Sequence, residues 1–169
     1  MRRVSVIATG GTIEKVYSEQ TGTVQNVDGK IEPYFASLRL PDTEIGVIHL
    51  MNKDSLEMTE EDRTKVLEAV RSALGRADSV VITHGTDTLV QTGMLLKANL
   101  PDLEAAIVMT GAMTPLGFEG SDGLQNLTES LLGARLLKPG IWLVIHGQVF
   151  PIERVRKNRE LARFEWIEG

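Results

Sequence analysis

The stretch VSVIATGGTIE, Val4 to Glu14, joins an apolar run to two glycines and a threonine. The run is rich in β-branched residues and apolar on both faces, which is typical of a strand buried inside a parallel sheet. Glycine loses much conformational freedom on folding, so a pair at a strand end indicates that something approaches the backbone closely there. A tight turn, a phosphate cradle and a small exposed nucleophile are the three interpretations.

Three more runs of this kind follow along the chain, and each is cut by a small or polar step. They are Val80 to Thr83, Ala106 to Thr110 and Ile141 to His146, with the endings THG, TGA and HGQ. A further strand is expected from Ile45 to Met51. The recurrence of these endings is more informative than any one of them, because a single Thr-Gly step is a common turn.

Helical patterns lie between these runs. The clearest begins with Thr59 and Asp62 as a near capping box and stops at Gly75. Two more are expected at Thr88 to Asn99 and from about Leu124 to Leu137. Strands that alternate with helices form βαβ units, so we expect an α/β fold with a doubly wound, mostly parallel sheet and helices on both faces.

The composition predicts one globular domain over residues 1–169. Hydrophobic residues make up 42% of the chain, an ordinary value for a packed core. There is no cysteine and no apolar run of about 18 residues, so we expect a cytoplasmic protein without membrane spans. The formal net charge of −5 gives no broad basic field, which argues against nucleic acid as a partner.

Two groups of charged or metal-binding side chains need an interpretation. The histidines lack the spacing of a zinc-binding helix and have no cysteine beside them, so no metal site is expected. Basic residues crowd near the end of the chain, and we interpret them first as a solvated helix face and second as a site. They are Arg154, Arg156, Lys157, Arg159 and Arg163.

In a doubly wound sheet, ligands bind outside the carboxyl ends of the strands. The repeated Thr-or-His-plus-Gly endings are therefore expected to meet in one crevice. The segment from Tyr17 to Pro41 is long and polar for an ordinary connection. It is either a flap over that crevice or a surface loop.

The residues at the strand ends favour acyl transfer. Neither a P-loop nor a dinucleotide-binding glycine motif is present, and the nucleophile elbow of the α/β-hydrolases is missing too. What remains is Thr12, Thr86 with Asp87, and Lys157. A lysine whose pKa is lowered by desolvation can take the proton of a hydroxyl or of water, and backbone N–H groups at the turns can stabilise an oxyanion. Helix capping by Thr86 or Asp87 is an equal alternative.

Several motifs in this chain resemble the bacterial-type L-asparaginase family, the threonine amidohydrolases. They occur in family order and span nearly the whole chain, and TGGTI with HGTDT is a highly specific combination. The motifs are ATGGTI (Ala8 to Ile13), DSLEMT (Asp54 to Thr59), THGTDTL (Thr83 to Leu89), TGAM (Thr110 to Met113), SDG (Ser121 to Gly123) with Asn126, and VRK ending at Lys157.

The resemblance implies hydrolysis of the side-chain amide of L-asparagine to aspartate and ammonia through an acyl-threonine, without a cofactor. It implies that Ser55 and Asp87 hold the α-carboxylate and the α-amino group, and that Gly10 and Gly11 clear space for the substrate. Tyr17 best matches the family's flap tyrosine, and Tyr34 is the other candidate. The implied catalytic residues are Thr12, Tyr17, Thr86, Asp87 and Lys157, and the implied substrate-binding residues are Gly11, Ser55, Thr86, Asp87 and Ala112.

The chain departs from the family pattern in length. Family members usually have a smaller second α/β domain, which we expect to be absent here. Glu14 also stands where the family usually has a small residue. The resemblance implies a homo-oligomer, first a dimer and second a tetramer. A glutaminase-asparaginase of broader specificity and a non-catalytic protein that binds asparagine or aspartate are the alternatives; an amidotransferase component that delivers ammonia is disfavoured for so short a chain.

Overall fold

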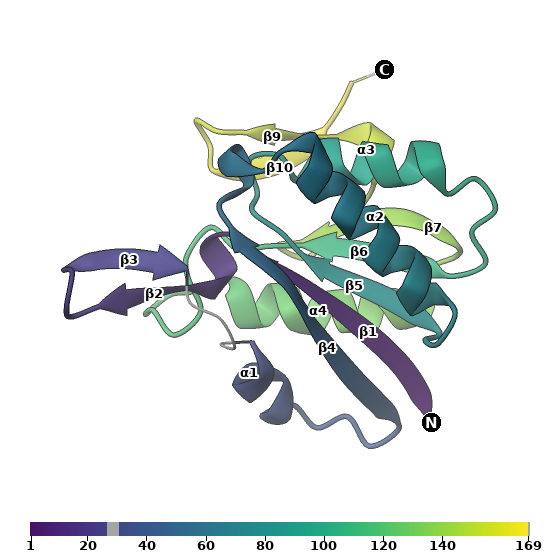
Figure 1. The fold of residues 1–169 in the computed structure, drawn as a ribbon, viewed down its shortest axis with the longest axis horizontal. Coiled ribbons are helices and arrows are strands. Elements are labelled where there is room, and N and C mark those ends of the chain that lie inside the picture. Colours follow the sequence, from purple (N-terminus) through teal and green to yellow (C-terminus); the bar gives the residue numbers. More distant parts are fainter. Residues whose placement is uncertain (27–30, 169) are drawn as a thin grey trace.

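A six-stranded sheet between two layers of helices forms the body of the molecule (Figure 1). The computed structural model describes residues 1–26 and 31–168. The strand order is β4-β1-β5-β6-β7-β8; all neighbours are parallel except β7 and β8, which are antiparallel. The sheet strands are β1 (Arg2–Gly10), β4 (Thr43–Lys53), β5 (Ser79–Thr83), β6 (Ala106–Thr110), β7 (Gly140–Ile145) and β8 (Gln148–Pro151); the helices are α1 (Glu32–Ala36), α2 (Glu60–Leu74), α3 (Leu89–Asn99) and α4 (Gly123–Leu136).

The alternation of side chains along the central strands divides the core into two halves. Ile7 and Ile82 belong to one apolar cluster, which also contains buried residues of α2 and α3. Val6 and Val81, their neighbours in sequence, belong to a second cluster with residues of α1 and α4. Both faces of the sheet are therefore covered, which explains why these strands carry apolar residues on both faces.

The α/β fold predicted from the sequence is confirmed. The predicted run Ala106 to Thr110 has the bounds of β6, and the other predicted strands differ from the observed ones by a residue or two at their ends. Helix α2 begins after Thr59 and has Gly75 as its C-cap residue. The capping box is complete, because Thr59 Oγ1 accepts from the Asp62 amide and the Asp62 carboxylate accepts from the Thr59 amide.

Four of the five basic residues near the end of the chain lie on a β-hairpin, and Arg154 lies in the short 3₁₀ helix Ile152–Arg154 before it, so the prediction of one solvated helix face is wrong. Strands β9 (Val155–Asn158) and β10 (Arg163–Trp166) pair antiparallel. Val155 and Phe164 are buried in the core cluster of α2 and α3, while Arg156 and Arg163 are exposed. This alternation of buried and exposed residues has the period of a strand. The basic residues considered without their apolar neighbours do not show it.

The segment from Tyr17 to Pro41 is more regular than predicted. It includes most of a projecting hairpin of β2 (Lys15–Ser18) and β3 (Thr23–Asn26), followed by α1. Gly22 lies in the hairpin turn with a φ of 65°, a conformation that suits glycine. Residues 27–30, which include Gly29, lie outside the described residues.

Successive strands are added to the sheet on opposite sides of β1, so the topological switch point lies between β1 and β5. The chain passes from β1 to its neighbour β4, and then returns to β5 on the other side of β1 before continuing to β6 and β7. In doubly wound sheets the ligand crevice forms where the connections from two adjacent strands diverge in this way. The turns after β1 and β5 are therefore where a ligand site is expected.

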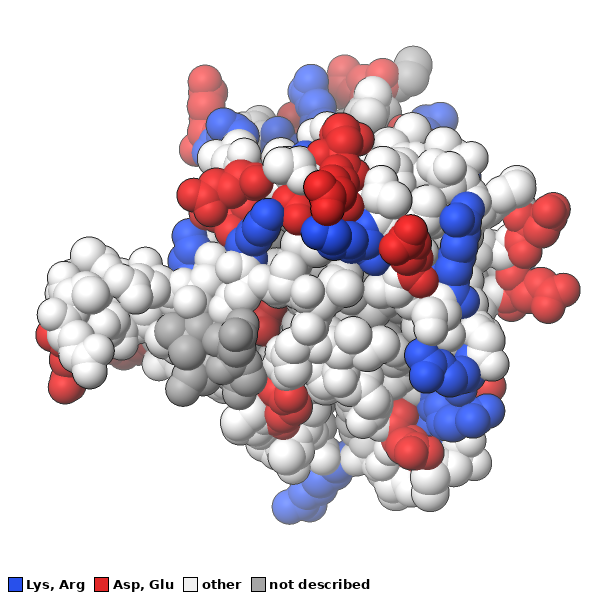
Figure 2. All heavy atoms as spheres, viewed as in Figure 1, with Lys and Arg blue, Asp and Glu red and all other residues white. Residues whose placement is uncertain are grey.

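The surface that carries α2 and β4 has mixed charges (Figure 2). Acidic and basic side chains are interspersed over it, and pairs such as Lys65 with Glu61 account for part of the pattern. Within the described residues, no helix is long and apolar enough to cross a membrane.

The capping box gives a prediction for stability against pH. Hydrogen bonds from Lys53 and from Thr59 lower the pKa of Asp62 from 3.8 to about 2. A carboxyl whose pKa is lower in the folded state stabilises the protein above its unfolded pKa, and the contribution disappears as the pH falls from about 4 to about 2. Asp62→Asn is expected to lower the free energy of unfolding by about 1 to 2 kcal/mol at about pH 7 and by much less at about pH 2.

Urea unfolding at several pH values measures this difference. Glu61→Gln is the control, because Glu61 lies on the same turn with a side chain that is 79% exposed and pairs with Lys65 on the helix surface. A constant difference between Asp62→Asn and the wild type down to about pH 2 would contradict the linkage.

Candidate active site

Three glycine-containing turns meet at the carboxyl ends of β1, β5 and β6. A Cβ atom on Gly11 would lie 2.5 Å from the backbone of Gly85, and one on Gly111 would lie 2.4 Å from the carbonyl oxygen of His84. A Cβ atom on Gly85 would lie 2.6 Å from that of Ser55. Real side chains do not tolerate such distances, so glycine at these positions allows the turns to pack together.

The room left by the first glycine pair is filled by protein backbone. Gly10 and Gly11 have φ values of 95° and 79°. A Cβ on Gly10 would lie 2.5 Å from the backbone nitrogen of Lys53. The prediction was that Gly10 and Gly11 leave space for a substrate. At the positions of their Cβ atoms it is wrong, because the backbone of neighbouring turns occupies that space.

Thr12 follows directly at the start of a short 3₁₀ helix, Thr12–Glu14. Its side chain is partly exposed, whereas Ile13 and Glu14 are buried. A carboxylate oxygen of Glu14 accepts a hydrogen bond of 2.9 Å from the amide of Gly10. Glu14, which departs from the family pattern, therefore supports the turn that presents Thr12.

Lys157 joins the turn after β5 to the C-terminal hairpin. Its Nζ donates to Thr86 Oγ1 at 2.7 Å and to Asp87 Oδ1 at 2.9 Å. The side chains of Lys157 and Asp87 are 16% and 28% exposed, so the ion pair is shielded but reachable from solvent. The structure thus brings together three of the residues that the sequence predicted, although they lie 70 and 71 positions apart in the chain.

The alternative role of Thr86 and Asp87 as helix caps is not observed. Helix α3 has Thr88 as its N-cap residue and no side-chain cap. The Thr88 hydroxyl instead donates to the carbonyl of Ser55 at 2.8 Å, and the Thr88 amide donates to Ser55 Oγ at 3.3 Å. Ser55 is 1% exposed, so these bonds fix a buried residue beside the glycine turns.

His84 is a structural residue of the site that the sequence reasoning did not single out. It is fully buried, and burial lowers its pKa from 6.5 to about 4, which leaves the imidazole neutral near neutral pH. Nδ1 lies 2.8 Å from the carbonyl oxygen of Gly85, so it carries the proton and donates. Nε2 then accepts from Thr92 Oγ1 at 2.8 Å. The step Thr-His-Gly in the sequence was the available signal.

A second polar network holds the turn that contains Ala112. Asp122 accepts hydrogen bonds from the amides of Met113 and Thr114 and, at 2.6 Å, from Nε2 of His146. Burial tends to raise the pKa of Asp122, but the bonds from Met113 and His146 outweigh it and the pKa is lowered. Asn126 donates to the carbonyl of Gly111 at 2.9 Å. The SDG motif and Asn126 therefore hold this turn in place.

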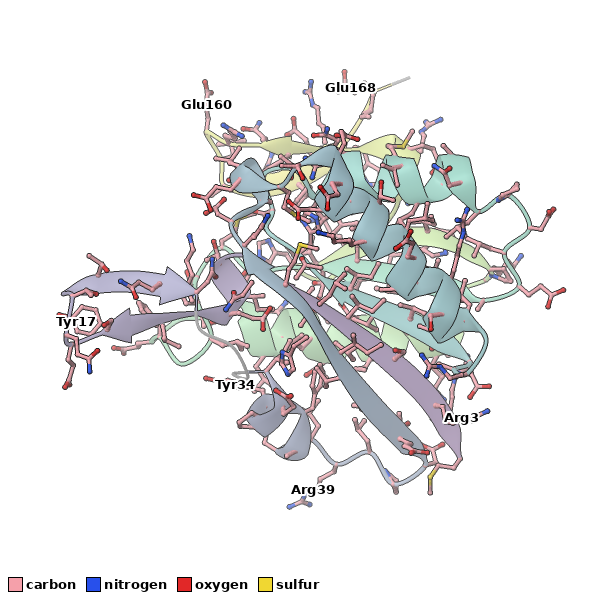
Figure 3. All side chains as sticks on the ribbon, in the orientation of Figure 1. Arg3, Tyr17, Tyr34, Arg39, Glu160 and Glu168 are labelled. Atoms are coloured by element: carbon pink, nitrogen blue, oxygen red, sulfur yellow. The ribbon has the colours of Figure 1, made fainter. Side chains whose placement is uncertain are left out.

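The two tyrosines lie on different elements, Tyr17 on the β2–β3 hairpin and Tyr34 on α1 (Figure 3). Tyr17 is on the projecting β2–β3 hairpin with 58% of its surface exposed. Tyr34 is on α1 and packs against the core cluster of α1 and α4, so it is part of the body of the domain. Among the described residues neither tyrosine forms a hydrogen bond with Lys157, and the flap role stays a prediction.

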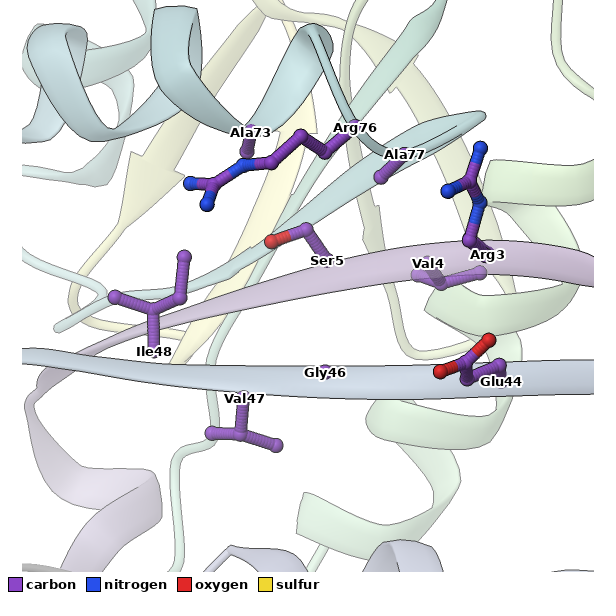
Figure 4. Close-up of a pocket in the computed structure, with 10 residues that line it drawn as sticks. All are labelled: Arg3, Val4, Ser5, Glu44, Gly46, Val47, Ile48, Ala73, Arg76 and Ala77. Atoms are coloured by element: carbon purple, nitrogen blue, oxygen red, sulfur yellow. The ribbon is translucent and has the colours of Figure 1, made fainter.

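A hollow of about 260 Å³ lies elsewhere, between the first half of β1, β4 and the end of α2 (Figure 4). It is lined by Ser5, Gly46, Arg76 and seven other residues, and none of the residues predicted for the site is among them. Among the described residues, no group of three or more histidines, aspartates and glutamates could hold a metal ion.

The sequence profile of the family described as "Asparaginase, N-terminal" matches residues 3–165. The chain belongs to the asparaginase family. The resemblance inferred from the motifs is thereby confirmed. The solved thermostable L-asparaginase of Thermococcus kodakarensis superposes with a TM-score of 0.87 at 31% identity, covering 98% of this chain and 51% of the other. The L-asparaginase I of Vibrio cholerae gives 0.81 at 25% identity and similar coverage.

Two curated relatives also match most of this chain in sequence. The L-asparaginase of Thermococcus kodakarensis is 32% identical over 161 residues, which are 95% of this chain and 49% of that protein. A component of the glutamyl-tRNA(Gln) amidotransferase of Thermoplasma acidophilum is 29% identical over 130 residues, 77% of this chain and 32% of that protein. The chain therefore spans half or less of the length of these relatives.

The contact between glycine turns gives a prediction with a matched control. Gly85→Ala is expected to destabilise the fold by about 1 to 3 kcal/mol, because its Cβ would overlap Ser55. Gly46→Ala is the control: a Cβ there would meet no atom within 4 Å, and we expect a change within about 0.5 kcal/mol. Chemical denaturation measures both. Equal effects of the two substitutions would show that the turns are not in the contact described.

Proposed function

We propose that this chain hydrolyses the side-chain amide of L-asparagine to L-aspartate and ammonia. The single observation that carries the proposal is the contact of Lys157 with both Thr86 and Asp87, next to the turn that presents Thr12, in a chain of the asparaginase family. This contact supports the proposal because it joins a hydroxyl, an amine and a carboxylate near the turns after β1 and β5, where doubly wound sheets bind their ligands.

In the first half of the proposed reaction, Thr12 Oγ attacks the carbonyl carbon of the amide. A bond forms between that carbon and Oγ, the carbon–nitrogen bond breaks, and ammonia leaves with the hydroxyl proton. The partly exposed position of Thr12 at the start of its 3₁₀ helix supports this role. Backbone N–H groups of the glycine turns are suited to stabilise the oxyanion.

In the second half, water attacks the carbonyl carbon of the acyl-threonine, the bond from that carbon to Thr12 Oγ breaks, a proton of the water passes to Thr12 Oγ, and L-aspartate is released. Lys157 and Thr86, which are joined by a hydrogen bond of 2.7 Å, are proposed to relay that proton. Asp87 orients the lysine through the bond of 2.9 Å. Ser55, beside Gly85, and the carbonyl of Ala112, beside Gly111, are proposed to bind the substrate, together with Gly11. The reaction as written needs no cofactor.

The substrate range is part of the proposal. A glutaminase-asparaginase is the alternative within the same chemistry, because one methylene is worth only about 1 to 3 kcal/mol in discrimination. A protein that binds asparagine or aspartate without turnover is the alternative outside it. The similarity to an amidotransferase component makes ammonia delivery to a partner a further reading, which copurification would test.

We propose further that residues 1–169 act as one catalytic domain, that the chain forms a homo-oligomer, first a dimer, and that it works in the cytoplasm. The core on both faces of the sheet supports the proposal of one domain. The proposal of a cytoplasmic location rests on the absence of cysteine from the sequence. Light scattering of the purified chain measures the oligomer.

Ammonia release from L-asparagine tests the proposed reaction. Thr12→Ala and Lys157→Ala are each expected to lower kcat by at least about 100-fold, because each removes a group that acts on the reacting atoms. Lys65→Ala is the control for the second change: Lys65 is an exposed lysine on α2 that pairs with Glu61. It should leave the rate unchanged.

Undiminished ammonia release by Thr12→Ala and Lys157→Ala would refute the mechanism. L-glutamine and D-asparagine in the same assay distinguish the narrower from the broader amidohydrolase. Binding of L-asparagine by calorimetry without any ammonia release would favour the non-catalytic alternative.

A further inference from the structure

The hydroxyl of Thr86 lies between two side chains that offer it different partners. Lys157 Nζ donates to Thr86 Oγ1 at 2.7 Å, and Thr86 Oγ1 donates to Met113 Sδ at 3.9 Å. A charged lysine has three hydrogens to donate and no acceptor, so the hydrogen of the Thr86 hydroxyl must point away from it. The thioether sulfur of Met113 is the acceptor that the structure places there. The proposed reaction uses Lys157 and Thr86, but it gives Met113 no role.

The methyl group of Thr86 is confined as well. A Cβ atom built on Gly111 would lie 3.1 Å from Thr86 Cγ2, so this methyl group packs directly against the backbone of the Gly111 turn. Because the two heavy atoms on the Cβ of a threonine restrict its χ1 angle, a methyl group held in place also fixes the direction of the hydroxyl oxygen. Gly111 and Met113 belong to the same TGAM turn, which therefore contacts both branches of the Thr86 side chain.

Met113 is itself held at its backbone and at its side chain. Its amide donates to both carboxylate oxygens of Asp122, at 3.1 and 3.0 Å. Asp122 in turn accepts from His146 and from the side-chain amide of Asn126. The side chain of Met113 packs against the core cluster that contains residues of α2 and α3. The polar network of the SDG motif is therefore connected to Thr86 through Met113.

The weakness of sulfur as an acceptor suits a hydroxyl that has to change partner. A hydroxyl in a proton relay donates to one partner while it accepts from the other, and it exchanges these roles when the proton moves. Thr86 is only 6% exposed, so an apolar side chain in place of Met113 would leave its hydroxyl hydrogen without a partner in a buried position. A strong acceptor would hold the hydrogen in one direction. A thioether directs the hydroxyl while Lys157 is charged, and this bond is broken at little cost.

We infer that Met113 is a positioning residue for Thr86. Its sulfur accepts from the hydroxyl, so that a lone pair of Thr86 Oγ1 faces Lys157 and the hydroxyl is aligned for the relay. Met113 acts through the Thr86 hydroxyl and needs no contact with the substrate. The effect on the rate rests on the proposed function, whereas the contact with the hydroxyl can be tested without turnover.

The rate test measures ammonia release from L-asparagine by Met113→Leu, which conserves the volume of the side chain and removes the acceptor. We expect kcat to fall by about 3- to 10-fold, the range of one hydrogen bond, and KM to change by less than about 2-fold. In a Thr86→Val background, which lacks the hydroxyl, the same change is expected to have no further effect on kcat.

Met109→Leu is the control for the rate test. Met109 is a fully buried methionine of the core cluster against which Met113 packs, so its replacement changes the packing of the same region. It should leave kcat within about 2-fold of the wild type, because the Thr86 hydroxyl keeps its acceptor.

The contact test uses the NMR signals of isotope-labelled methionine methyl groups. The chain has six methionines, and the signal that is missing from Met113→Leu belongs to Met113. Thr86→Val replaces the hydroxyl by a methyl group of similar size. It is expected to shift the Met113 signal more than the signal of any other methionine. Met113→Ile takes the place of Met113→Leu in both tests if the leucine variant does not fold.

A fall in kcat that is specific to Met113→Leu and absent from the Thr86→Val background supports the inference, together with a shifted Met113 signal. An unchanged kcat in Met113→Leu, an equal loss in Met109→Leu, or the same loss in the Thr86→Val background would overturn it. So would an unmoved Met113 signal in Thr86→Val. No ammonia release by the wild type would instead refute the proposed function, and the NMR comparison would still decide whether Met113 holds the Thr86 hydroxyl.

Discussion

The close approach of backbone at Gly11, Gly85 and Gly111 is the constraint on which the arrangement of the site depends. Gly11 and Gly111 directly follow β1 and β6, Gly85 comes two residues after the end of β5, and a methyl group on any of them would overlap a neighbouring turn. Because the turns touch, residues that follow the glycines are brought to one edge of the sheet. Thr12 is positioned by this packing, and Thr86 is positioned by the packing together with the hydrogen bond that it accepts from Lys157.

Buried polar groups then hold the turns in their conformations. Glu14 accepts from the amide of Gly10, His84 donates to the carbonyl of Gly85, and Asn126 donates to the carbonyl of Gly111. Each bond satisfies a backbone group that would otherwise be left unpaired in a buried turn, where the loss is large. The C-terminal hairpin adds the charged part of the site, because β9 carries Lys157 across to Thr86.

The sequence predicted the parts of this arrangement that have a local cause. The apolar strands, the capping box at Thr59 and the glycine steps are encoded in short stretches of sequence, and the mostly parallel arrangement of the sheet follows from the alternation of strands with helices. The sequence also predicted that Lys157 acts together with Asp87, and the two side chains form an ion pair of 2.9 Å. The prediction of a helix in place of the β9–β10 hairpin was wrong because it considered only the basic residues and not the buried Val155 and Phe164, which have the alternation of a strand.

What the sequence could not supply are the contacts between distant turns. Nothing near Gly11 in the chain indicates that its Cβ position faces Gly85, and nothing near Arg159 indicates that it shares an oxygen of Asp87 with Lys157. Such contacts depend on the relative placement of strands that are far apart in the chain. The position of Tyr17 could not be predicted either, because its spacing from Thr12 in the sequence does not indicate that it lies on a projecting hairpin.

The central claim is that the glycine turns present Thr12 as the nucleophile while Thr86 and Lys157 serve the proton transfer. Mass spectrometry of the protein, quenched in acid during turnover of L-asparagine and digested into peptides, tests this most directly. The account predicts an aspartyl group on the peptide that contains Thr12, and its accumulation in a Lys157→Ala variant. An aspartyl group on Thr86 instead, or ammonia release without any acyl-threonine, would contradict it.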